Sequence, residues 1–76
     1  MNKKEILIRL NNITESKNAT LELLKKWYDN SRDYYITKWC LINFFDTLAN
    51  EVLYDARCEG IFLYFDTLDN RWREDK

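Results

Sequence analysis

Histidine and proline are absent from this 76-residue chain, and glycine occurs once. Without histidine the chain has no imidazole base, no Ser-His-Asp or Cys-His device and no His-ligated zinc. One glycine cannot build the glycine-rich loops that hold phosphates or dinucleotides. Carboxylates remain as acid–base groups, but no spacing among them demands catalysis. We therefore predict that the protein is not an enzyme and binds no cofactor or metal.

Long apolar runs are also missing. The longest unbroken run, Ile61–Phe65, has five residues, whereas a membrane-spanning helix needs about 20. The first ten residues lack the apolar core of a signal peptide. The two cysteines, Cys40 and Cys58, form no CxxC pair, and on one helix they would lie ~27 Å apart at 1.5 Å per residue. We predict a cytoplasmic protein with two reduced, partly buried thiols and no membrane partner.

What is present is ordinary for a soluble globular chain: 46% hydrophobic residues, 33% charged residues and a net charge of -1. The length fits a single domain, residues 1–76, with a small core. Asn, Lys and Ile together supply 21 residues against three alanines. Such a bias is typical of AT-rich genomes, including those of low-GC bacteria and their phages, and suggests a phage or mobile-element origin.

The scarcity of glycine and proline favours long helices over tight turns. Asn2 followed by Glu5 predicts a helix that begins near Lys3. The polar segment 11–18 predicts a break, because its side chains compete for backbone hydrogen bonds. A second helix would then end at Asn30, and Asn30-Ser31 would form a short turn into a third helix.

That third helix should be the central one, with an apolar stripe at helical spacing formed by Leu41, Phe45, Leu48, Val52 and Ala56. Gly60 fits its C-terminal cap. Residues 61–74 fit either another helix or two strands around a turn at Asp69-Asn70. The leading prediction is a mainly α fold, a bundle of three to four helices with one long central helix. The alternative is α+β, with a C-terminal β-hairpin from about residue 51.

Aromatic residues are more numerous than a core of this size can absorb: three Trp, five Tyr and four Phe. Tyr and Trp are enriched at protein interfaces because they bury a large area at low entropic cost. Five of them surround the predicted second turn: Trp27, Tyr28, Tyr34, Tyr35 and Trp39. We interpret these five as candidate anchors for a protein partner.

Charge is unevenly distributed along the chain. Residues 1–45 hold eight basic and five acidic side chains, whereas residues 46–69 hold one basic and six acidic. Glu51, Asp55 and Glu59 follow one another at four-residue steps, so a continuous helix would place them on one face. This acidic row fits a docking surface for a basic partner, and equally a solvated face.

These features favour a small non-enzymatic protein that binds another protein, as a regulator or inhibitor, through an aromatic and acidic helical surface. The partner would be a host or defence complex, or a second copy of the chain. One alternative is a nucleic-acid-binding regulator that uses its basic N-terminal helices, but no dense basic patch supports it. Another alternative is a self-assembling structural protein.

Overall fold

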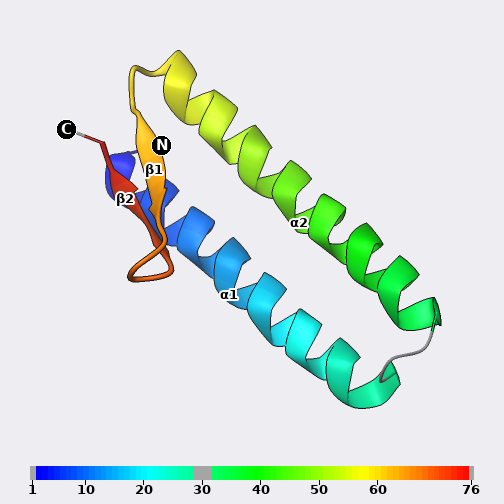
Figure 1. Cartoon of the computed structure of the whole chain (residues 1–76). Coiled ribbons are helices and arrows are strands. Elements are labelled where there is room, and N and C mark those ends of the chain that lie inside the picture. Colours follow the sequence, from blue (N-terminus) through cyan, green and yellow to red (C-terminus); the bar gives the residue numbers. More distant parts are fainter. Residues whose placement is uncertain (1, 29–31, 76) are drawn as a thin grey trace.

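Two long antiparallel helices form most of the molecule, and a short β-hairpin follows them (Figure 1). The computed structural model describes residues 2–28 and 32–75. Helix α1 spans Lys3–Tyr28 and helix α2 spans Arg32–Cys58. Strands β1 (Leu63–Asp66) and β2 (Arg71–Glu74) pair antiparallel. The fold is α+β and elongated, with dimensions of 43 × 22 × 16 Å.

The predicted bundle of three to four helices is therefore wrong. Residues 11–18 continue α1 without a break. The Thr14 hydroxyl donates to the Leu10 carbonyl at 3.2 Å, and the Asn11 amide binds the β-hairpin rather than its own helix. These hydrogen bonds satisfy the two polar side chains without interrupting the backbone hydrogen bonds of α1, so the predicted break does not occur. The predicted turn at Asn30-Ser31 lies outside the described residues.

The two predicted helix caps that fall on described residues, Asn2 and Gly60, are confirmed. The Asn2 side chain accepts the N–H of Glu5 at 2.8 Å and caps α1. At the end of α2, Gly60 has φ 77°, its N–H donates to the Arg57 carbonyl, and Ile61 N–H donates to Ala56. These two bonds form a Schellman motif, in which glycine takes the left-handed position at no steric cost.

The C-terminal segment forms a hairpin, as the alternative reading proposed, but strand β1 starts at Leu63 and not near residue 51. Helix α2 runs through Asn50 to Cys58. In the hairpin, Phe65 pairs with Trp72, and the two rings meet edge to face at 5.4 Å. Asp66 Oδ1 accepts the N–H of Leu68 at 2.9 Å, and Asn70 supplies the positive φ of 54° that closes the turn.

The β-hairpin is fastened to α1 by polar and apolar contacts around Trp72. Trp72 N–H donates to Asn11 Oδ1 at 2.7 Å, and the indole N–H donates to Thr14 Oγ1 at 3.1 Å. Lys3 and Glu74 form an ion pair at 2.7 Å. Trp72 also packs against the buried cluster of Ile6, Leu10 and Ala56. The hairpin therefore closes the core where α1 begins and α2 ends.

Candidate protein-binding surface

The β-hairpin lies at the end of the helical pair where α1 begins and α2 ends, and no described residue forms a further layer at the opposite end (Figure 1). We call residues 19–28 and 32–45 the open half. Among its described residues, Leu24 is the one buried side chain. Large apolar side chains that are more than half exposed gather there instead: Leu23, Trp27, Tyr28, Tyr35, Ile36, Trp39 and Phe44.

A groove of about 390 Å³ marks the border between the two halves. It is lined by Ile13, Thr14, Lys17, Asn18, Phe45, Asp46, Ala49, Phe65, Asn70 and Trp72. Lys17 and Asp46 form an ion pair at 3.2 Å across the helices. This pair shows which parts of the two antiparallel helices lie opposite each other. Both side chains line the groove together with Asn70, so they mark the side of each helix that faces the hairpin turn.

Three aromatic residues extend this groove into the open half. Tyr35 and Trp39 precede Asp46 by eleven and seven residues, about three and two helical turns, so they lie on the same side of α2. Tyr28 follows Lys17 by eleven residues and lies on the matching side of α1. Their exposed fractions are 51% for Tyr28, 52% for Tyr35 and 65% for Trp39. We call these three residues the aromatic shelf.

Two of the five predicted aromatic anchors lie elsewhere. Tyr34 is half-buried; its ring meets Tyr35 edge to face at 5.2 Å, and Lys38 Nζ lies 5.7 Å from its centroid. Trp27 is 79% exposed. It follows Thr14 by thirteen residues, a rotation of about 220°, which places it on the far side of α1 from the β-hairpin.

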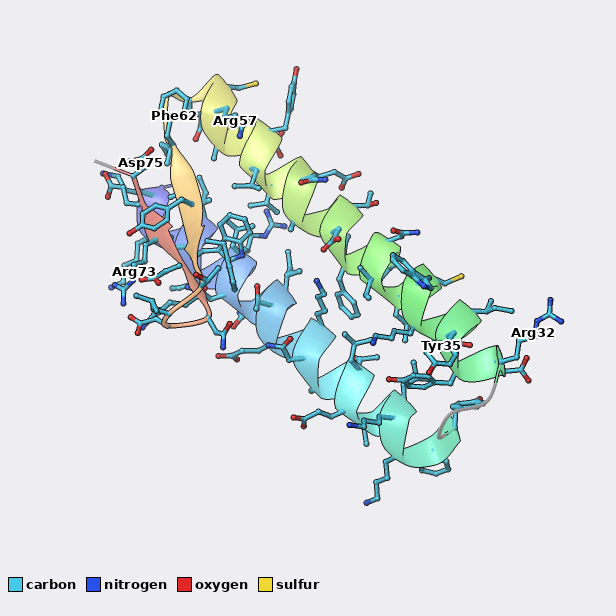
Figure 2. All side chains as sticks on the ribbon, viewed as in Figure 1. Arg32, Tyr35, Arg57, Phe62, Arg73 and Asp75 are labelled. Carbon is cyan, nitrogen blue, oxygen red and sulfur yellow. The ribbon has the colours of Figure 1, made fainter. Side chains whose placement is uncertain are left out.

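The acidic row is separate from the aromatic shelf. Glu51 and Asp55 lie on α2, and Glu59 lies just beyond its end; all three are exposed. Twenty residues separate Tyr35 from Asp55 on one helix, which corresponds to about 30 Å. Figure 2 shows Arg32 and Tyr35 at the open end of α2 and Arg57, two residues after Asp55, at its opposite end. The predicted single aromatic and acidic surface is therefore two surfaces.

Among residues 2–28 and 32–75, no group of three or more His, Cys, Asp or Glu side chains is placed to hold a metal ion. The charged pair in the groove, Lys17 and Asp46, is mutually neutralised. Cys40 and Cys58 both lie on α2, as expected, but both are exposed, so the prediction of partly buried thiols is wrong.

One carboxylate has a shifted pKa, and its role is structural. Partial burial alone would raise the pKa of Asp66. The N–H groups of Asp69 and Leu68 and the Arg73 guanidinium, whose Nε lies 2.9 Å from Oδ2, outweigh this effect and hold the pKa below its usual value. Arg73 also pairs with Asp69. These bonds fix the hairpin turn.

Comparison with protein-family models, with curated proteins and with solved structures found no match. Within residues 2–28 and 32–75, neither helix is long and apolar enough to cross a membrane.

Proposed function

We propose that this protein is a small non-enzymatic regulator or inhibitor that binds another protein through the aromatic shelf. The observation that carries the proposal is the exposure of Tyr28, Tyr35 and Trp39, which helical spacing places on one side of the helical pair at its open end. Aromatic anchors on helices suit binding because they lose little rotamer freedom on burial. The adjoining groove offers a recess for a partner side chain.

Basic side chains flank the shelf and suggest the charge of the partner. Residues 17–45 carry five basic and three acidic side chains. Lys25 lies eight residues after Lys17, a rotation of about 80°, and Arg32 and Lys38 lie on α2 beside Tyr35 and Trp39. A partner segment with apolar side chains bordered by carboxylates would complement this surface, and the charges would speed its association.

Nucleic acid is the second candidate partner, as the basic residues of α1 suggest. Lys3 and Lys17, however, already form ion pairs with Glu74 and Asp46. Phosphate binding weakens steeply with salt. Titration with DNA and RNA at two salt concentrations tests it, and strong binding at low salt would favour it over a protein partner.

Affinity capture with matched variants tests the proposed function. The wild-type chain, a Tyr35→Ser/Trp39→Ser variant and a Tyr54→Ser control would be used as baits in lysate of the source cell. Tyr54 is a suitable control because it is 69% exposed but lies on α2 outside the shelf. We expect a specific protein to be retained by the wild type and the control and lost with the shelf variant. Equal retention by all three baits would contradict the proposal.

A further inference from the structure

The face of the helical pair opposite the β-hairpin carries an uncharged stripe on each helix. On α1, Ser16, Thr20, Leu23 and Trp27 repeat at steps of four, three and four residues. Leu23 follows Thr14, which bonds the β-hairpin, by nine residues. Nine residues are two and a half turns, so Leu23 points away from the hairpin.

Helix α2 matches this stripe with Thr37, Leu41, Phe44 and Leu48, at the same spacing and also without charge. Phe44 is 57% exposed, as is Leu23. Leu53 packs against the buried cluster, as do the strand residues Leu63 and Trp72. It lies nine residues after Phe44. Phe44 therefore also points away from the hairpin. Both stripes together form what we call the uncharged face.

The exposed area of the chain is too large for a compact monomer. A monomer of 9.3 kDa is expected to expose about 5,000 Å², whereas this chain exposes 6021 Å². The radius of gyration is 14.2 Å, against about 11.4 Å for a compact domain of this length. The excess of about 1,000 Å² is comparable to the ~800 Å² that each partner buries in a stable interface.

We infer that a second copy of this chain covers the uncharged face, so that two helical pairs form an antiparallel four-helix bundle with the β-hairpins outside. Depletion of charge is typical of the centre of protein interfaces. A two-fold axis near Leu41 and Phe44 would bring the acidic row of one copy toward the end of the other copy that carries Lys26, which lies three residues after Leu23 on α1. A parallel pair would instead place the acidic rows together, where they would repel each other.

Sedimentation equilibrium of the full chain over about 1–300 µM tests this inference. We expect a mass of twice 9.3 kDa for the wild type and dissociation at least tenfold easier for Leu23→Lys and for Phe44→Lys, because each introduces an unpaired charge into the interface. The Tyr54→Lys variant is the matched control and should remain a dimer. Circular dichroism would show that each variant keeps its helices.

Spin labels on Cys58, with Cys40 replaced by serine, determine the orientation. Antiparallel packing predicts a separation of about 45 Å between the two labels, and parallel packing about 20 Å. A monomer at every concentration would overturn the inference, as would a dimer that Leu23→Lys and Phe44→Lys leave intact, and a short distance would overturn the antiparallel arrangement. The aromatic shelf lies on the other face, so a monomer that still binds a partner through Trp39 would leave the proposed function standing.

Discussion

Replacing Asn11 by leucine tests how the β-hairpin is held on the helices. The Asn11 amide meets the backbone edge of β2: Oδ1 accepts Trp72 N–H at 2.7 Å, and Nδ2 donates to the Trp72 carbonyl at 3.5 Å. Leucine keeps the size but offers no acceptor, and it raises the helix propensity, a change that the control variant Asn12→Leu shares. A partly buried N–H without a partner costs about 1–3 kcal/mol, and we expect about 2 kcal/mol for this half-buried site. A chain of this length has a total stability of about 4–11 kcal/mol.

Urea unfolding followed by tryptophan fluorescence, at one fixed protein concentration, measures this loss. With a slope of about 1 kcal/mol per molar urea, the midpoint should fall by about 2 M in Asn11→Leu. Asn12→Leu is the matched control, because Asn12 is the exposed neighbour and exposed substitutions usually change stability by under about 0.5 kcal/mol. Equal midpoints for the two variants would refute the role assigned to Asn11.

Three further predictions follow from single features. Gly60→Ala should cost about 1–2 kcal/mol because φ is 77°, a left-handed conformation that disfavours a Cβ; no atom lies within 4 Å of the added Cβ, so no clash adds to this cost. Thermal unfolding would show a lower Tm, and an unchanged Tm would contradict the cap. Because the pKa of Asp66 lies below its usual 3.8 in the folded chain, its contribution to stability is present above that value and is lost as pH falls through the lowered pKa; near-UV circular dichroism of Trp72 should show the hairpin loosening below about pH 4, and Asp66→Asn should abolish that part of the pH dependence. Replacing Glu51, Asp55 and Glu59 together by their amides should weaken partner binding, here self-association, in a salt-dependent way while folding is kept; unchanged affinity would exclude the acidic row from the interface.

Structural features that depend only on residues close together in the chain could be predicted from the sequence. Asn2 as an N-cap and Gly60 as a C-cap depend on chain neighbours a few residues away. The polar segment 11–18 was misleading because its partners are distant in sequence: Asn11 and Thr14 bind Trp72, about sixty residues away. Side chains that suggest a helix break in isolation are here the contacts that fasten the hairpin.

A repeated segment shows the same limit. The sequence FDTLAN at 45–50 lies within α2, whereas the nearly identical FDTLDN at 65–70 forms the end of β1 and the turn. In the second copy, Asp66 caps the turn and Arg73 pairs with Asp66 and Asp69. In the first, the Thr47 hydroxyl donates to the Asn43 carbonyl within the helix. Tertiary context decides between these structures, and local propensity does not.

The candidate surface was predictable only in part. Three of the five aromatic anchors form the shelf, because helical spacing from Lys17 and Asp46 places Tyr28, Tyr35 and Trp39 on the groove side of the helices. Tyr34 and Trp27 do not, since one helical position rotates a side chain by about 100°. The uncharged face was not predicted, because the sequence alone does not show which side of each helix the β-hairpin covers.

Site-specific photo-crosslinking tests the central claim, that the aromatic shelf binds a protein, most directly. A photoreactive phenylalanine analogue would replace Trp39 in one variant and Tyr54 in a control, and both would be irradiated in the source cell. We expect a discrete crosslinked protein from position 39, of a mass other than twice 9.3 kDa, and none from position 54. No protein adduct at position 39, or the same adducts from both positions, would contradict it.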